Sequence, residues 1–394
     1  MEIFSESEKV MWDKPIKEPS ESLSDAELNE KYKAGDHRIV TETNREKIPN
    51  FVKALEKPDY MQIRPFYQRR DRWDRERQSQ LIESFIMNIP VPPLFLYEKD
   101  FNKYEVMDGQ QRITALQSFY SGEFKLSGLD IWKELNGRTY STLPSQVRSG
   151  IDRRSISYIV VLRESTPDEE DAIFLRQTVF ERLNTGGIRL EHQEIRNCLY
   201  QSQFNKLLVK LTETDDFRDS FGLPRYTVEE EEPNAEIKKA AIYQKMSDVE
   251  IVLRFFALRH IAHYTKGMHG FLDLYMARAR NFSFQDLEIL KNLFLDTIRL
   301  ARNIYADLIF RPYSPEKGEW QSRAHKAFYD AVMVSLSSVL SQSDILIGKK
   351  DEIIQETQKL FENNPSGTFT GRGNTKADIQ ERIQKYSDMI HNLL

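Results

Sequence analysis

The secondary-structure signal changes near residue 200, and this change limits the fold more than any other feature. Before it, short aliphatic and aromatic runs that suit strands alternate with helical periodicities, whereas only helical periodicities remain after it. This pattern predicts the α+β class, with an N-terminal α/β core followed by an all-helical C-terminal domain. The 394 residues, 40% of them hydrophobic, are enough for more than one core. We expect an acidic arm over residues 1–45, an α/β domain over 46–200 and a helical domain over 201–394.

The individual elements are predicted from periodicity. Leu81, Ile82 and Phe85 recur at helical spacing, and Pro90 ends that run. Strands are predicted over residues 94–98, 104–108 and 158–162. Long amphipathic helices are predicted over residues 238–264, 283–310, 320–344, 350–363 and 374–393.

Charge and cysteine content limit the class of partner and the compartment. The formal net charge is −5, so we expect any nucleic acid to be bound by a local basic patch. The single cysteine, Cys198, forms no intrachain disulfide, which favours a reducing cytoplasm, and a small buried helix residue is its simplest role. The sequence shows no signal-peptide pattern and no long apolar run, so we expect a cytoplasmic protein without a membrane partner.

The N-terminus is strongly acidic. Residues 1–30 contain nine acidic residues and three lysines, with little periodicity. We expect a loosely held, solvated arm. The alternative is a strap that covers a basic site until a ligand displaces it.

The segment YEVMDGQQRITALQSFY (104–120) passes from a strand pattern into a helix pattern. A helix N-terminus presents backbone N–H groups and the positive end of the helix dipole, which together bind anions. Gly109 lets a ligand approach the backbone closely. Arg112 lies in the first turn, where a cation is otherwise unfavourable, and its planar guanidinium suits a phosphate. This turn is a candidate anion site.

Three other polar side chains belong to the same turn. Asp108 suits a divalent metal or a ribose hydroxyl, and Gln110 and Gln111 suit a phosphate or a water molecule. The alternative is an ordinary helix start that is capped by Asp108, with Arg112 at the surface.

A second cluster, IRPFYQRRDRWDRERQ (63–78), carries six arginines against three acidic residues, with aromatic residues between them. Arginine beside aromatic rings suits phosphates and bases, so Arg70, Arg72 and Arg75 are candidates for contact with DNA. Ion pairs within a solvated helix start are the alternative explanation.

A glycine-containing loop at residues 184–187 follows a predicted helix. A helix C-cap explains two consecutive glycines, but the loop would also be able to present backbone N–H groups to the ligand of the first turn. The sequence contains no Walker-type phosphate loop and no H-E-x-x-H metal motif. His260 and His263 lie three residues apart on an apolar helix, where we expect ordinary packing.

Several segments follow one another in an order that resembles a known family. They are IRPFYQR, LIESFIMNIPVPPLFLYE, YEVMDGQQRITALQSFYSGEF and VFERLNTGGIRLEHQEIRN. Over about residues 45–200 the chain resembles the N-terminal domain of GmrSD-type, modification-dependent restriction endonucleases, and it does so more weakly beyond. The domain of that family resembles the ParB/sulfiredoxin fold. The resemblance therefore implies a ParB/sulfiredoxin-like, nucleotide-binding domain over residues 46–200.

The resemblance implies which residues form the nucleotide site. Its catalytic residues would be Asp108, Gln110, Gln111 and Arg112, and Asp108 would also contact Mg²⁺. The nucleotide-binding residues would be Gln68, Arg69, Gly109, Arg112, Asn184 and Gly187.

The same resemblance implies an NTP-binding and NTP-hydrolysing module of a DNA-modification-sensing, anti-phage restriction system. Nuclease-bearing members carry a C-terminal HNH domain, and no matching histidine pattern follows residue 200. Two alternatives stay open: a non-catalytic nucleotide- or DNA-binding switch subunit for a partner nuclease, and a stand-alone, Mg²⁺-dependent DNA nuclease. The expected partners are a nucleotide, DNA, and a partner nuclease or further copies of the chain.

Overall fold

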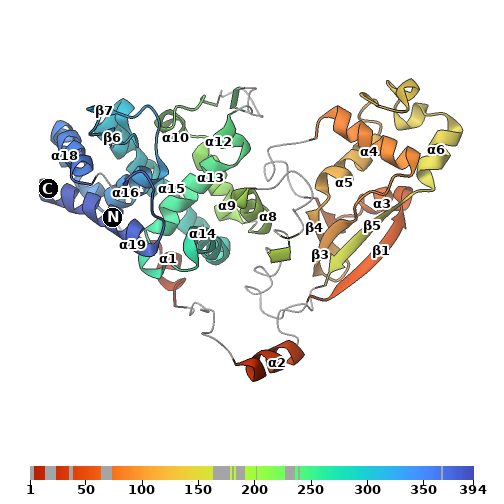
Figure 1. Cartoon of the computed structure of the whole chain (residues 1–394), viewed down its shortest axis with the longest axis horizontal. Helices are drawn as coiled ribbons and strands as arrows, with labels where there is room; N and C mark the ends of the chain where they lie inside the picture. Colours follow the sequence, from red (N-terminus) through yellow and green to blue (C-terminus); the bar gives the residue numbers. More distant parts are fainter. Residues whose placement is uncertain are drawn as a thin grey trace. The chain divides into compact units, whose positions relative to one another are not determined.

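The chain forms two compact units, which are described separately. The α/β unit comprises Pro19–Leu190, and the helical unit combines Met1–Glu18 with Glu191–Leu394, as the sequence colours of Figure 1 show. The computed structural model describes residues 4–13, 24–34, 39–63, 73–162, 178–179, 182, 191–200, 202–226, 236–237, 240–364 and 367–394.

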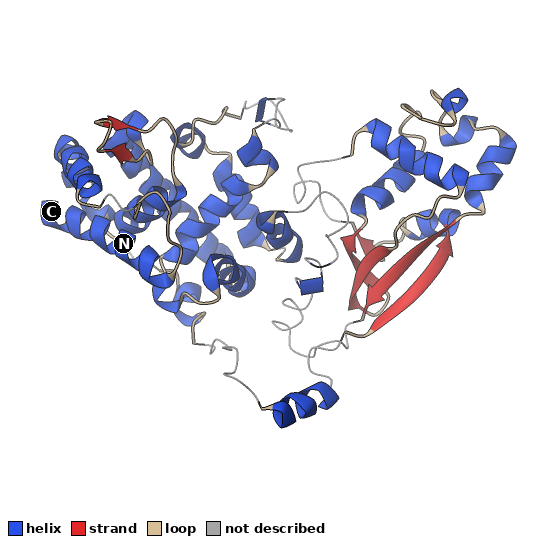
Figure 2. Ribbon diagram, in the orientation of Figure 1, coloured by secondary structure: helices blue, strands red, loops and turns tan. Residues whose placement is uncertain are grey.

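The α/β unit is built on a five-stranded mixed sheet, drawn in red on the right of Figure 2. Its strand order is β1-β5-β3-β4-β2. The β1·β5 and β3·β4 pairs are antiparallel, whereas β3·β5 and β2·β4 are parallel. The strands are β1 (Thr41–Lys47), β2 (Met61–Gln62), β3 (Leu94–Asp100), β4 (Lys103–Asp108) and β5 (Ser155–Val161). This sheet, followed by a helical region, confirms the predicted α+β class.

Helices pack on one face of this sheet, and the core lies between the two layers (Figure 2). Alternation along β3 and β4 places Leu94, Leu96 and Val106 on the core side, where all three are buried. The helices add Phe51, Ile82 and other apolar side chains to the same core. The helices of this unit are α2 (Asp25–Ala34), α3 (Ile48–Ala54), α4 (Arg75–Met87), α5 (Gln110–Tyr120) and α6 (Ser145–Asp152), with 3-10 helices η2 (Lys133–Leu135) and η3 (Tyr140–Thr142).

Asp152 fixes the C-terminal end of α5 to α6. The hydroxyl groups of Tyr120 and Tyr140 each donate to its carboxylate at 2.9 Å, and the two rings stack with centroids 4.3 Å apart. Burial and then the hydrogen bond to Asp152 raise the pKa of Tyr140 to about 12, so its hydroxyl stays a donor at neutral pH. The helix that follows the 108–112 turn is therefore held firmly at its far end.

The helical unit packs around α13 (Ser247–Leu258) and α16 (Lys326–Ser337), whose side chains are mostly buried. Ser283 and Asp286 form a capping box at the start of α15 (Phe284–Tyr305). The other helices are α1 (Glu6–Val10), α8 (His192–Leu199), α9 (Gln203–Thr212), α10 (Asp215–Ser220), α12 (Ala241–Gln244), α14 (Gly267–Arg278), α17 (Ser343–Gly348), α18 (Lys350–Glu362) and α19 (Lys376–Leu393). The 3-10 helices are η5 (Ile261–His263), η6 (Ala279–Asn281), η7 (Ala306–Leu308) and η8 (Leu340–Gln342).

One short strand pair departs from the predicted all-helical character of this region. β6 (Tyr313–Ser314) and β7 (Glu319–Trp320) pair antiparallel across a turn. Gly318 adopts a φ of 68° in that turn, which favours glycine. Each strand has only two residues, so neither is long enough to produce an alternating pattern in the sequence.

The first described residues correct the prediction of a loosely held arm. Ser5 caps α1 through a capping box with Glu8. Glu8 is completely buried and pairs with Arg259 at 3.0 Å. The acidic composition suggested solvation, but the two partners are 251 residues apart in the sequence, so composition alone gave no sign of the pair.

Among the described residues, no single helix has both the length and the apolar character needed to cross a membrane. One bent pair, Lys326–Ser337 with Leu340–Gly348, meets that test jointly. Most of the first helix of this pair is buried inside the helical unit.

Candidate functional site: the turn between β4 and α5

The 108–112 turn forms as predicted between a strand and a helix. β4 ends at Asp108, Gly109 is the N-cap, and α5 begins at Gln110. Gly109 has a φ of 96°, a conformation that glycine adopts without steric cost. A Cβ atom at this position would lie 2.3 Å from Leu94 Cδ2, which is in the core. Glycine is therefore required both by the backbone angle and by the close approach of β3.

The N-terminus of α5 has the features of an anion site. No side chain caps it, so the alternative in which Asp108 caps the helix is wrong. The first helical bond runs from Ile113 N to Gly109 O at 2.9 Å, which leaves the preceding backbone N–H groups outside the helical ladder. α5 has 11 residues, so its dipole adds positive potential at this end.

Arg112 folds back onto its own turn. Its Nη2 donates to Asp108 Oδ2 at 2.6 Å, and its Nη1 donates to the carbonyls of Pro92 and Pro93. The side chain of Arg112 is 11% exposed, whereas that of Asp108 is 35% exposed. Arg112 therefore links the end of β4 to the segment before β3, and the alternative of a surface arginine is wrong.

The two glutamines have different surroundings. Gln111 is buried, and its Oε1 accepts a hydrogen bond from the backbone N–H of Trp73 at 3.2 Å. This bond ties the turn to the residues that precede α4. Gln110 is only partly buried. Of the two predicted catalytic glutamines, Gln111 is thus placed to position the backbone, and Gln110 is the one nearer to solvent.

The remaining predicted residues divide into two groups. Arg75 donates to Gln78 Oε1 at 2.9 Å and lies over the Phe124 ring at 5.1 Å, so it packs against its own unit. The others lie outside the described residues: Gln68, Arg69, Arg70, Arg72, Asn184 and Gly187.

The carboxylate of Asp108 is compatible with a nucleotide-bound Mg²⁺. Mg²⁺ usually takes one or two protein carboxylates together with substrate phosphates and waters. Asp108 is partly exposed, and its hydrogen bond to Arg112 uses Oδ2. In the part of the chain that the structure describes, no group of three or more acidic, histidine or cysteine side chains is arranged to hold a metal ion. The donor set thus fits a metal held mainly by a nucleotide rather than by a protein cage.

The residues that pack against this turn were not predicted from the sequence. The carbonyls of Pro92 and Pro93 and the side chain of Leu94 lie about 15 to 20 positions before it, and proline and leucine carry no functional signal. The one available hint was the PVPP run, which predicts an extended segment with carbonyls that are free of a helix.

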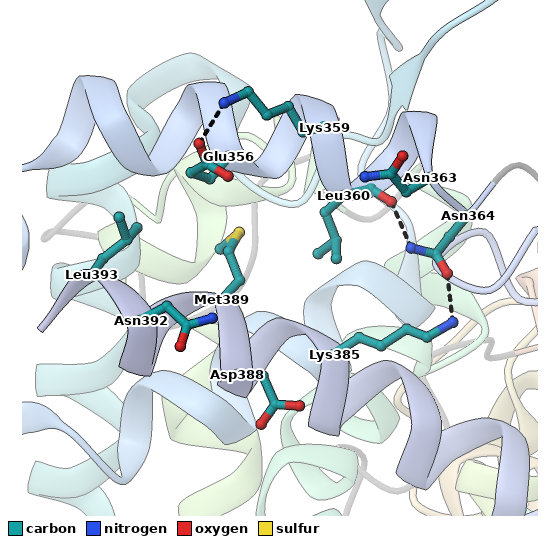
Figure 3. Close-up of a pocket in the computed structure, with 10 residues that line it drawn as sticks. All are labelled: Glu356, Lys359, Leu360, Asn363, Asn364, Lys385, Asp388, Met389, Asn392 and Leu393. Carbon is teal, nitrogen blue, oxygen red and sulfur yellow. Dashed lines mark hydrogen bonds and ion pairs between the residues drawn. The ribbon is translucent and has the colours of Figure 1, made fainter.

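A pocket of about 540 Å³ lies elsewhere, between α18 and α19 of the helical unit (Figure 3). Its polar groups bond to one another: Lys359 pairs with Glu356 at 2.6 Å, Lys385 donates to Asn364, and Asn364 donates to the Leu360 carbonyl. These pairings give no sign of a missing ligand.

Replacing Gly109 with alanine is expected to destabilise the α/β unit more than the same change at Gly122. Both glycines have positive φ, 96° and 75°, but a Cβ at Gly122 meets nothing within 4 Å. The backbone term costs about 1–2 kcal/mol at either site, and overpacking against Leu94 adds about 1–3 kcal/mol at Gly109 alone. Urea unfolding of the two variants checks this difference. Equal losses would show that Leu94 does not crowd the turn.

The sequence was compared with known proteins. Residues 50–201 match the family model described as the GmrSD restriction endonuclease, N-terminal domain. Searches of curated proteins and of solved structures found no match. The matched segment contains the whole 108–112 turn and ends after α8.

Proposed function

Residues 50–201 belong to the GmrSD restriction endonuclease N-terminal domain family, which indicates a component of a restriction system, and from this premise we propose that the chain binds and hydrolyses a nucleoside triphosphate. The observation that carries the proposal is the uncapped N-terminus of α5 behind Gly109, with Asp108 and Arg112 beside it. Backbone N–H groups, a helix dipole and a guanidinium converge there, and this combination binds phosphate.

Binding would place the phosphates against the start of α5. The backbone N–H groups after Gly109 would donate to phosphate oxygens, which approach closely because position 109 has no Cβ. Arg112 would exchange part of its bonding to Asp108 for the γ-phosphate, since a guanidinium has five N–H donors. Asp108 and Gln110 would then face the solvent side of the bound nucleotide.

Hydrolysis in this proposal needs no covalent intermediate. The oxygen of a water molecule bonds to the γ-phosphorus while the bond to the bridging oxygen breaks, and the water's proton leaves on the released inorganic phosphate. Arg112 and the helix N-terminus stabilise the charge on the phosphate oxygens. Mg²⁺, when bound with the nucleotide near Asp108, supplies further neutralisation of that charge. Gln110 orients the attacking water.

We propose that this hydrolysis serves a DNA-modification-sensing, anti-phage restriction system, in which DNA cleavage is carried out by a partner nuclease. A partner nuclease is proposed because the histidine pattern of an HNH domain does not follow residue 200 in the sequence. A switch that binds nucleotide without turnover is the second candidate. The closed Asp108–Arg112 pair favours it, because a ligand able to open the pair would change the local structure.

Calorimetry separates these two functions. The full chain is titrated with a nucleoside triphosphate and Mg²⁺, and in parallel with a non-hydrolysable analogue. The proposal predicts saturable binding of both and a continuing heat of hydrolysis with the triphosphate alone. Binding of both without continuing heat would select the switch. Binding of neither by a folded chain would contradict the assignment of the site.

A further inference from the structure

A carboxylate receptor in the helical unit holds the N-terminal segment, residues 4–13. Glu8 is completely buried, and its carboxylate accepts hydrogen bonds from two residues at the C-terminal end of α13. Arg259 donates at 3.0 and 3.2 Å, and His260 Nε2 donates at 3.0 Å. The hydroxyl of Tyr275 on α14 donates to the same carboxylate at 2.8 Å. The backbone N–H of Ser5 completes the set at 3.1 Å.

The hydrogen bond from Trp12 determines which protonation state of His260 fits this receptor. Its indole N–H donates to His260 Nδ1 at 2.9 Å. Because an indole nitrogen is a donor only, Nδ1 of His260 has to be the acceptor, and the ring proton therefore lies on Nε2, which donates to Glu8. A second proton on His260 would place two donors face to face at Nδ1. The closed arrangement thus requires a neutral His260.

The rest of the segment is held by ring stacking and short polar contacts. Trp12 stacks on His263 with centroids 4.6 Å apart, and the guanidinium of Arg278 lies over the Trp12 ring at 4.9 Å. Arg278 also donates to the Met11 carbonyl at 2.8 Å. Ser7 donates its hydroxyl to Asp286 at 2.7 Å. α1 has only five residues, so these contacts, rather than helix stability, hold the segment in place.

The same two helices also hold α8, the first helix after the α/β unit. Arg196 is almost completely buried and pairs with Asp273 on α14 at 2.6 Å and with Glu250 on α13 at 3.1 Å. Arg196 Nη2 also donates to His269 Nδ1 at 3.2 Å, so α8 is held partly through a histidine acceptor of its own. α13 and α14 therefore contact the chain both before and after the α/β unit in the sequence, and His260 belongs to the N-terminal contact.

We propose that residues 4–13 form a latch that closes when Glu8 enters the Arg259–His260–Tyr275 receptor and opens on acidification, when His260 takes up a proton. Opening frees the chain on the N-terminal side of the α/β unit, while the Arg196 pairs keep α8 in place. All residues of this latch belong to the helical unit, and its closing does not depend on nucleotide binding.

The direction of the pH response follows from the groups around the ring. The groups that face His260 are Glu8 from α1, Arg259 beside it, His263 on η5 and Tyr275 on α14. Burial lowers the pKa of His260 below its usual 6.5, although Glu8 opposes this shift. Relative to an ordinary histidine, the closed latch disfavours the protonated ring, so it is most stable above pH 6.5 and weakens as the pH falls below that value.

Glu8 acts in the same direction over a lower range. Burial on its own raises the pKa of Glu8, but the hydrogen bond from His260 and the charge of Arg259 outweigh it, so the net pKa lies below 4.5. The stabilisation from Glu8 is present above pH 4.5 and is lost as the pH falls through its lowered value. Burial also lowers the pKa of His263, which stacks on Trp12, so between about pH 7.5 and 5.5 the response should come from His260 with a smaller part from His263.

Hydrogen–deuterium exchange of the full-length chain tests the latch, with amides 4–13 as the readout and intrinsic exchange rates divided out. Glu8→Gln should lower their protection on the order of 100-fold, because Arg259 loses its buried counter-charge. Glu6→Gln is the matched control, since Glu6 lies on the same helix but is 79% exposed, and it should stay within about twofold. Tyr275→Phe removes one donor, keeps the packed ring, and should cost about tenfold.

The pH dependence of exchange tests whether His260 controls the latch. In the wild type, protection of amides 4–13 should fall roughly tenfold between about pH 7.5 and 5.5. His260→Gln, which retains an amide donor and acceptor without titrating, should remove most of the fall. Equal protection in Glu8→Gln and Glu6→Gln would overturn the receptor. A wild-type response that persists undiminished in His260→Gln would overturn the histidine switch.

Discussion

Replacing Arg112 with alanine is expected to lower phosphate release from a nucleoside triphosphate by at least about 100-fold, because a preorganised donor at a developing charge is worth roughly that factor. Among the described residues, Arg112 is the arginine that lies at the α5 N-terminus, next to Asp108. Release is measured as inorganic phosphate at saturating nucleotide and Mg²⁺. Turnover at the wild-type rate in folded Arg112→Ala would contradict the assignment.

Two further variants separate a role in binding phosphate from a role in holding the turn. Arg112→Ala also removes the donors to Asp108 and to the Pro92 and Pro93 carbonyls, and this should cost about 1–3 kcal/mol of stability. Arg112→Lys keeps the charge but not the planar fork, so it should recover stability more than activity. Arg153→Ala is the control, because Arg153 is exposed at the end of α6, and it should change neither.

The second large effect is expected in the core of the helical unit. Arg254 and Asp330 form a buried ion pair in which Nε donates to Oδ1 at 3.0 Å, and the side chains are only 7% and 0% exposed. Arg254→Ala leaves the carboxylate buried without its partner, which typically costs about 3–5 kcal/mol. Denaturant unfolding, followed by amide exchange in α13 and α16, measures the loss.

Two further variants serve as controls for the loss of stability in Arg254→Ala: one breaks an exposed ion pair, and the other removes both charges of the buried pair. Lys359→Ala breaks the Lys359–Glu356 pair, whose side chains are 60% and 36% exposed, and should cost less than about 1 kcal/mol. Arg254→Met combined with Asp330→Leu removes both charges and should recover much of the stability lost in Arg254→Ala. Similar losses in Arg254→Ala and Lys359→Ala would show that burial does not set the value of the pair.

The parts of the fold with regular periodicity were predictable. α4, β3, β4 and α5 follow the apolar spacing and the glycine and proline positions closely. β1 was not predicted, because its sequence, TETNREK, is polar and its side chains are mostly exposed. It is an edge strand that pairs with β5 alone, so backbone hydrogen bonds rather than apolar burial define it.

In the candidate site too, features set by neighbouring residues were predictable, whereas contacts between residues far apart in the sequence were not. The turn at Gly109 was predictable because strand, glycine and helix signals are contiguous. The position of Arg112 was not, since its partners Pro92 and Pro93 contribute only backbone carbonyls. The burial of Glu8 was hidden for a similar reason: its partner Arg259 comes from the opposite half of the sequence. Pairings of this kind depend on tertiary packing, which no local pattern records.

Phosphate release by the purified chain, measured with each nucleoside triphosphate in the presence of Mg²⁺, tests nucleotide hydrolysis most directly. We predict release of many phosphates per chain for at least one triphosphate, and loss of that release in Arg112→Ala but not in Arg153→Ala. A folded chain that releases no phosphate from any triphosphate, or an Arg112→Ala variant that releases it as fast as the wild type, would contradict the account.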